Sequence, residues 1–132
     1  MCNNTKKILI IDDDEDLVEA NKIILEANNY NVVCAYNGRD GFDMAISEEP
    51  DLIMLDVSME KKDEGFYVCQ RIRQQPSIKN TPILMITAIH QETKLRFSPK
   101  TDGDYLQVNE FVDKPLDPNI LIKLVEKWIK KH

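Results

Sequence analysis

Two features of membrane and exported proteins are missing from this sequence of 132 residues. No stretch approaches the run of about 18 apolar residues that a membrane-spanning helix requires, and residues 1–7 lack the apolar core of a signal peptide. The three cysteines, Cys2, Cys34 and Cys69, form neither a CxxC pair nor an even set. A reduced, cytoplasmic compartment is therefore expected, with Cys34 and Cys69 in the core.

The sequence also lacks the usual marks of proteins that bind nucleic acids or nucleotides. Its net charge is −6, and its acidic residues crowd into residues 12–19 and 48–64, which argues against a nucleic-acid surface. Neither a GxxxxGKS/T loop nor a GxGxxG loop occurs, so nucleotide hydrolysis has no support. His90 and His132 lack the spacing of metal ligands and are expected at the surface.

What the sequence does contain is a regular alternation of apolar runs and helical patterns. Strands are predicted at residues 8–11, 32–35, 52–55, 83–86 and 110–112, and helices near residues 17–27, 41–46, 66–72 and 118–129. Residues 89–109 show a weaker pattern, with a turn or two of helix near 91–97. Strands separated by helix-length segments predict parallel βαβ units in one doubly wound α/β domain spanning residues 1–132.

Apolar residues that recur at helical spacing identify the predicted helices. Those of the first helix are Leu17, Ala20, Ile24 and Ala27, followed by the breaker Asn28-Asn29. After an Asn37-Gly38 turn, Phe42, Ala45 and Ile46 of the second helix are expected to point inward. The last helix has an apolar stripe formed by Ile120, Leu121, Leu124, Val125, Trp128 and Ile129.

Carboxylates follow two of the predicted strands. Asp12 and Asp13 come after the first strand, and Asp56 comes after the third. If these strands are parallel neighbours, the three carboxylates converge where open α/β sheets place their ligands. Like charges about 4 Å apart repel by roughly 4 kcal/mol at an effective dielectric near 20, so the cluster requires a cation, and oxygen ligands favour Mg²⁺ or Mn²⁺. Residues 14–16 are expected instead to stabilise the start of the first helix.

Residues at four strand ends together resemble the signature of the response-regulator receiver domain. They are Asp12-Asp13 after strand one, Asp56 after strand three, Thr87-Ala88 after strand four and Lys114-Pro115 after strand five. This resemblance extends over nearly the whole chain. It implies a flavodoxin-like, five-stranded parallel sheet of order 2-1-3-4-5 with helices on both faces.

The resemblance also implies a role for each acidic residue. Asp56 would be the phosphoacceptor, whose carboxylate attacks a phosphoryl group and becomes an acyl phosphate. Asp13, Asp56 and the backbone carbonyl of Ser58 would hold Mg²⁺, and Asp12 would orient a metal-bound water.

The remaining positions of the signature would bind the phosphoryl group and transmit the signal. Lys114 would pair with Asp56 before transfer and with a phosphoryl oxygen afterwards. The hydroxyl of Thr87 would bind another phosphoryl oxygen, and its movement would carry the signal. Phe111 stands at the position of the family's switch aromatic, which turns inward on activation. The Lys114-Pro115 bond resembles one that receivers hold in the cis form.

Two segments depart from the family pattern. Glu60 stands where receivers usually carry proline, and residues 60–64 make the loop after the phosphoacceptor one residue longer than usual. The interval from Thr87 to Lys114 is also several residues longer. We therefore expect a short or displaced fourth helix and a long loop within residues 89–109.

The implied function is that of a stand-alone receiver. A histidine kinase or a histidine phosphotransfer protein would donate the phosphoryl group, and the face formed by the fourth and fifth helices would bind a downstream protein. Nothing after Trp128 could form a DNA-binding helix-turn-helix, so direct control of transcription would need a separate protein or a longer natural chain. Catalysis would be limited to self-phosphorylation and slow autodephosphorylation. The autodephosphorylation would be slow because Ser58 and Ile89 orient water poorly, and these two positions flank the path of the hydrolytic water in this family.

Two alternatives from other functional classes are considered. An aspartate-nucleophile phosphatase of the haloacid dehalogenase type also forms an acyl phosphate, but it needs a second aspartate at the position of Ser58. A phosphorylation-independent interaction module with a degenerate site is the other alternative. The complete set of acidic pair, Asp56, Thr87 and Lys114 argues against it.

Overall fold

The computed structural model describes residues 6–56, 64–87, 110–113 and 117–129, and only the backbone of residues 64–67, 87 and 110–113. Its elements are β1 (Lys7–Ile11), α1 (Glu15–Ala27), β2 (Asn31–Ala35), α2 (Gly38–Glu48), β3 (Leu52–Asp56), α3 (Glu64–Arg73), β4 (Ile83–Thr87), β5 (Glu110–Asp113) and α5 (Pro118–Ile129). The expected fourth helix in residues 89–109 lies outside the described residues.

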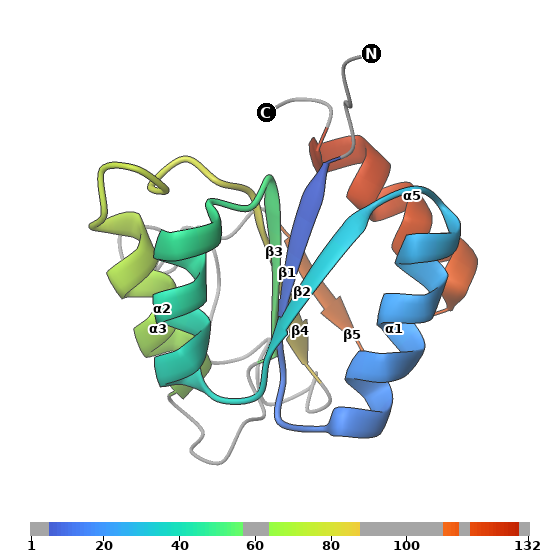
Figure 1. Ribbon diagram of the computed structural model, residues 1–132, viewed down its shortest axis with the longest axis horizontal. Coiled ribbons are helices and arrows are strands. Elements are labelled where there is room, and N and C mark those ends of the chain that lie inside the picture. The colour runs from blue at the N-terminus through green and yellow to red at the C-terminus, as the bar shows by residue number, and fades with distance from the viewer. Residues whose placement is uncertain (1–5, 57–63, 88–109, 114–116, 130–132) are drawn as a thin grey trace.

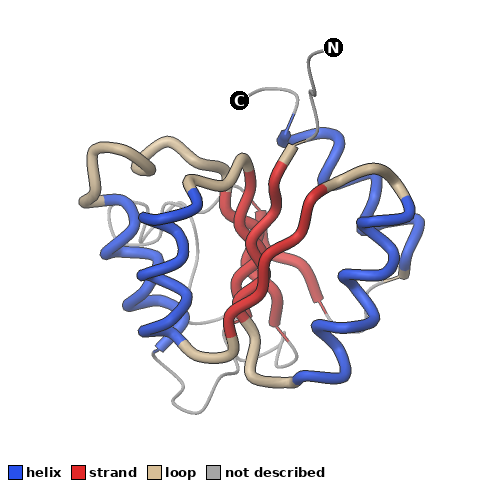
Figure 2. Tube along the Cα trace, viewed as in Figure 1, coloured by secondary structure: helices blue, strands red, loops and turns tan. Residues whose placement is uncertain are grey.

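The five strands form one sheet in the order β2-β1-β3-β4-β5, and every neighbouring pair is parallel. Figure 2 shows the strands, in red, between the two groups of helices. This is the order 2-1-3-4-5 that was expected from the sequence. All five residues of β3 are buried, and so are four of the five in β1. Strands covered on both faces require such nearly continuous apolar sequences, which explains why the runs at 8–11 and 52–55 identify them.

Helices cover both faces of the sheet. Helices α2 and α3 lie on one side and α1 and α5 on the other (Figure 1). The sheet separates two apolar clusters, one that contains Leu9, Ile11, Phe42 and Ala45 and another that contains Ile8, Ile10, Leu121 and Val125. The structure thus confirms the doubly wound α/β fold. Within the described residues, no helix is long and apolar enough to cross a membrane.

Helix α1 forms where the apolar spacing predicted it, and its buried residues lie one position beyond the apolar residues that marked it in the sequence. The side chain of Asp14 caps the helix by accepting a hydrogen bond from the backbone N–H of Leu17 at 3.1 Å. The buried residues are Val18, Asn21 and Leu25, whereas Leu17 and Ile24 are half-buried and Ala20 and Ala27 are exposed. The helix ends as expected, since Asn28 caps it and Asn29 has a φ of 72°.

Helix α2 begins three residues earlier than expected. Oδ1 of Asn37 accepts a hydrogen bond from the backbone N–H of Asp40 at 2.8 Å, so Asn37 is a helix cap and Gly38 is the first helical residue. Phe42 and Ala45 are buried as expected, but Ile46 is 37% exposed and does not point inward.

The apolar stripe of α5 is narrower than expected. Leu121, Val125 and Ile129 are buried, and Leu124 and Trp128 are half-buried. The side chain of Ile120 is 50% exposed. An exposed isoleucine is common at protein surfaces, so apolar character alone did not identify the buried face.

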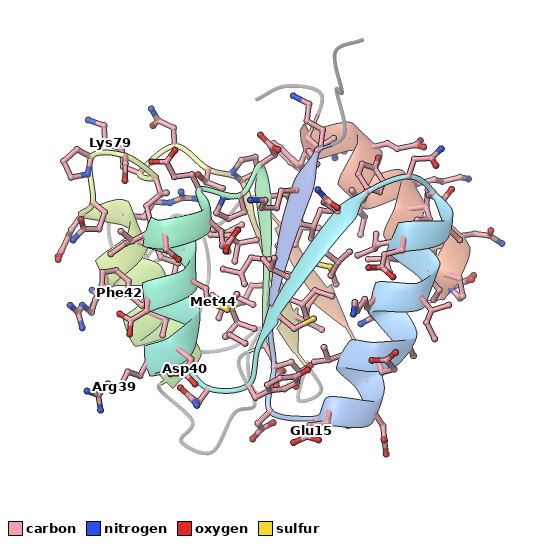
Figure 3. The ribbon with its side chains drawn as sticks, in the orientation of Figure 1. Glu15, Arg39, Asp40, Phe42, Met44 and Lys79 are labelled. Atoms are coloured by element: carbon pink, nitrogen blue, oxygen red, sulfur yellow. The ribbon has the colours of Figure 1, made fainter. Side chains whose placement is uncertain are left out.

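Side-chain contacts anchor α3 to its surroundings. The guanidinium of Arg71 lies 4.2 Å from the centroid of the Phe42 ring on α2. Nη1 of Arg73 donates hydrogen bonds to the carbonyl oxygens of Lys79 at 2.9 Å and Thr81 at 2.7 Å, which closes the turn before β4. Figure 3 labels Phe42 and Lys79 on this side of the molecule.

Both described cysteines are free thiols. Cys69 is fully buried in α3, as expected of a core residue. Cys34 in β2 is half-buried and packs against the cluster beneath α1 and α5.

Candidate functional site: three carboxylates at the strand ends

The carboxyl ends of β1 and β3 lie side by side in the sheet. Ile11, the last residue of β1, pairs with Leu55, so Asp12 and Asp56 are the next residues on neighbouring strands. The backbone N–H of Asp12 donates to the carbonyl oxygen of Ala35 at 3.1 Å, which extends the pairing of β1 with β2 by one residue. The sheet itself therefore fixes the backbone from which two of the carboxylates project.

One carboxylate oxygen from each of Asp12, Asp13 and Asp56 lies within 4.8 Å of the other two. Asp12 is 4% exposed and Asp56 is 2% exposed, whereas Asp13 is exposed. The structure therefore brings together the three acids that the strand ends predicted. Two of them form the buried side of the group, and Asp13 leaves it open to solvent.

The start of α1 is hydrogen-bonded to this group of carboxylates. Oδ1 of Asp12 accepts a hydrogen bond from the backbone N–H of Asp14 at 3.0 Å. Asp14 caps the helix, and Glu15 and Asp16 occupy its first turn, where the helix dipole favours negative charge. The assignment of residues 14–16 to helix stabilisation is thus confirmed for the cap and agrees with the position of the other two.

The donor set of this site fits a small divalent cation. Three unit negative charges held this close, two of them buried, repel one another strongly in a medium of reduced dielectric. A hard cation with oxygen ligands relieves this repulsion, and Mg²⁺ takes one or two protein carboxylates together with water and phosphate oxygens. Asp13 and Asp56 could serve as direct ligands, and Asp12 could accept a hydrogen bond from a water ligand through an oxygen that faces the group.

The remaining expected site residues are described in part or not at all. Thr87 ends β4, one residue beyond the partner of Asp56 in the register, and Phe111 lies in β5 opposite Met85. The backbone of Thr87 is thus in the strand next to β3, which carries Asp56, and that of Phe111 is one strand further away. The side chains of both residues are not described. Ser58, Lys114 and the Lys114-Pro115 bond lie outside the described residues, as do the loop at 60–63 and Ile89.

One close contact beside the site was not foreseen. A Cβ atom placed on Gly41 of α2 would lie 2.6 Å from Cδ1 of Ile11, the residue that precedes Asp12. In the structure Gly41 is inside α2, where glycine is less favourable than alanine and often has a packing reason. The sequence analysis placed Gly41 at the first position of the predicted helix, so it did not indicate this contact, and nothing in the sequence identified Ile11 as the neighbour.

Known proteins resemble this chain in both sequence and fold. A family model described as the response regulator receiver domain matches residues 8–126. A putative response regulator from Chloroflexus aurantiacus has 30% sequence identity and a TM-score of 0.81, and the match covers 96% of this chain and 99% of that one. For chemotaxis protein CheY4 of Vibrio cholerae the identity is 28%, the TM-score 0.80 and the coverage 94% and 98%. For the receiver domain of a signal transduction histidine kinase from Syntrophus aciditrophicus these values are 26%, 0.79, 96% and 92%.

Proposed function

The chain belongs to the response regulator receiver domain family, and we propose that it accepts a phosphoryl group on Asp56 from a histidine kinase or a histidine phosphotransfer protein. The observation that carries this proposal is the position of Asp56. Its carboxylate is almost completely buried, ends a central strand and lies within 4.8 Å of two further carboxylates. A phosphoryl acceptor needs a cation beside it, and the two neighbouring carboxylates are suitable ligands for one. A single buried aspartate without such neighbours would not provide a cation site.

The chemistry follows from these three acids. An oxygen of Asp56 forms a bond to phosphorus while the bond from phosphorus to the donor nitrogen breaks, and an acyl phosphate results. A bound Mg²⁺ supplies neutralisation of the negative charge on the transferring phosphoryl group. Asp13 and Asp56 would bind the ion, and Asp12 would hold a water ligand in place. The backbone hydrogen bond from Asp14 keeps the Asp12 carboxylate in that orientation.

Three residues complete the proposed site by their sequence positions. The carbonyl of Ser58 would be the third protein ligand of the ion, Lys114 would neutralise the acyl phosphate, and Thr87 would bind a phosphoryl oxygen. Thr87 and Phe111 then change position and alter the surface that binds a downstream protein. The strand positions of Thr87 and Phe111 support this part of the proposal.

The proposal includes a cytoplasmic location and no enzymatic turnover beyond the protein's own phosphorylation and its slow loss. The free thiols of Cys34 and Cys69 agree with a reducing compartment. Neither the phosphatase alternative nor the phosphorylation-independent module gains support from the family match, which is to receiver domains along most of the chain.

Phosphorylation with a small donor tests the proposal. The purified protein, incubated with acetyl phosphate and Mg²⁺, should gain one phosphoryl group that hydroxylamine removes, as it removes acyl phosphates. Asp56→Asn should gain none. Asp43→Asn, which removes an exposed acid from α2, is the matched control and should be modified like the wild type. A phosphoryl group that persists in Asp56→Asn would assign the modification to another residue.

A further inference from the structure

Gly41 lies in the first half of α2 at the place where this helix meets β1. A Cβ atom on Gly41 would lie 2.6 Å from Cδ1, 2.7 Å from Cγ2 and 2.8 Å from Cγ1 of Ile11. Such distances are too short for carbon atoms, whose contacts are optimal near 3.5–4.0 Å. No described glycine has a positive φ, and the N–H of Gly41 makes the ordinary helical bond to the carbonyl oxygen of Asn37 at 2.9 Å. Space, rather than backbone conformation, therefore requires glycine here.

Ile11 has little freedom to move away from this contact. Its side chain is 0% exposed and belongs to the apolar cluster beneath α2 and α3, together with Ala35, Ala45 and Leu55. A β-branched side chain in a strand also has few alternative rotamers. A larger residue at position 41 would thus displace the end of β1 or push α2 off the sheet.

The end of β1 is also the base of the carboxylate site. Ile11 is followed directly by Asp12 and Asp13, and it pairs with Leu55, which is followed directly by Asp56. A displacement of Ile11 is therefore passed through one peptide unit to the acid pair, and it changes the spacing of that pair from Asp56. Sites of this kind tolerate only about 0.5 Å of displacement before ligand geometry is lost.

We propose that Gly41 is a positioning residue for the carboxylate site. By omitting a side chain it lets α2 pack directly on Ile11, and this contact holds the end of β1 where Asp12 and Asp13 meet Asp56. The metal-binding part of this inference rests on the proposed function, while the positioning of the acids does not depend on it.

A cycle of three variants tests the contact: Gly41→Ala, Ile11→Ala and the double variant. Calorimetric titration of the metal-free proteins with Mg²⁺ gives the dissociation constant of each. Gly41→Ala should weaken binding about tenfold, because misplaced ligands lose most of the ion's coordination. In the Ile11→Ala background the three conflicting atoms are gone, so the same substitution should leave the dissociation constant unchanged.

Ala45→Val is the matched control. Ala45 is fully buried on the same face of α2, one turn further from the carboxylates, and an added side chain there overpacks the same cluster. It should lower stability without changing Mg²⁺ affinity. Equal weakening by Ala45→Val and Gly41→Ala would show that general loss of packing is responsible and would overturn the inference.

Backbone amide resonances in the metal-free protein provide a second readout. Gly41→Ala should shift the resonances of Asp12, Asp13 and Asp56, and Ala45→Val should not. Wild-type resonances and wild-type affinity in Gly41→Ala would overturn the inference. If the wild type fails to bind Mg²⁺, the proposed function fails, but the shifts still decide the role of Gly41. If Gly41→Ala does not fold, the double variant decides, because weaker Mg²⁺ binding than in Ile11→Ala would contradict the proposal.

Discussion

The backbone N–H of Asp14 donates to Oδ1 of Asp12 at 3.0 Å, which ties the buried carboxylate of the site to the cap of α1. Asp13, between them, is exposed. The two members of the acid pair therefore have different tasks. Asp12 is part of the folded framework, while Asp13 contributes its charge at the open side of the group.

Metal binding should stabilise the protein through Asp13. Mg²⁺ at about a hundred times its dissociation constant should add about 2.7 kcal/mol to the free energy of unfolding, because the ion binds only the folded group. Asp13→Asn should lose most of this increase and, without metal, should be more stable than the wild type since like-charge repulsion is reduced. Thermal unfolding with Mg²⁺ and with a chelator measures both effects. An unchanged metal-dependent shift would remove Asp13 from the site.

High pH should destabilise the fold through Cys69. Burial raises the pKa of this thiol from 9.0 to about 11. Above about pH 9 the unfolded chain loses the thiol proton while the folded chain keeps it, so stability falls by about 1.4 kcal/mol per pH unit until the folded pKa is passed. Below that range the contribution is fully present.

Cys69→Ala isolates this contribution, because the other groups that titrate at high pH remain in both proteins. Free energies of unfolding in urea, measured from about pH 8 to pH 11, should fall less steeply in the variant. Parallel curves for the two proteins would contradict the assignment to Cys69.

Replacing Asn21 by an apolar residue should stabilise the protein. It is 6% exposed within the buried stripe of α1, and its side chain has no hydrogen bond to any part of the chain that the structure describes. Burying an amide without a partner costs roughly 1–3 kcal/mol. Asn21→Leu should therefore raise the free energy of unfolding by about 1–2 kcal/mol. A loss of stability in chemical unfolding would indicate that the amide has a partner beyond the described residues.

The phosphorylated form should be long-lived because Ser58 and Ile89 supply no group that orients the hydrolytic water well. The double variant Ser58→Asn with Ile89→Glu should lose the phosphoryl group about tenfold faster. This requires the activation free energy of hydrolysis to fall by only about 1.4 kcal/mol. Mass spectrometry of the phosphorylated protein over time measures the rate of this loss. Fast decay of the wild type, with no acceleration in the double variant, would place the water elsewhere.

The strands and the acidic site could be predicted because both depend on short, local patterns. Central strands buried on both faces have continuous apolar runs, and the rule that parallel strand ends meet at one edge brings Asp12 and Asp56 together. The roles expected of Ser58, Thr87, Phe111 and Lys114 come from resemblance alone and stay predictions.

The errors arose where tertiary packing outweighs local pattern. Asn21 is buried although polar, and Ile46 and Ile120 are exposed although apolar. Asn37-Gly38 resembles a tight turn, yet Asn37 caps a helix, because both uses exploit the same short side chain. The contact of Gly41 with Ile11 joins residues from different elements, and no periodicity in the sequence encodes it.

Among the residues that the structure describes, the sheet also divides the interior into two compartments that share no side chain. Free-energy changes at sites without common neighbours are close to additive. Substitutions beneath α2 and α3 should thus be tolerated independently of substitutions beneath α1 and α5. Paired substitutions, one from each compartment and on different strands or helices, should therefore change the free energy of unfolding by close to the sum of the two single changes.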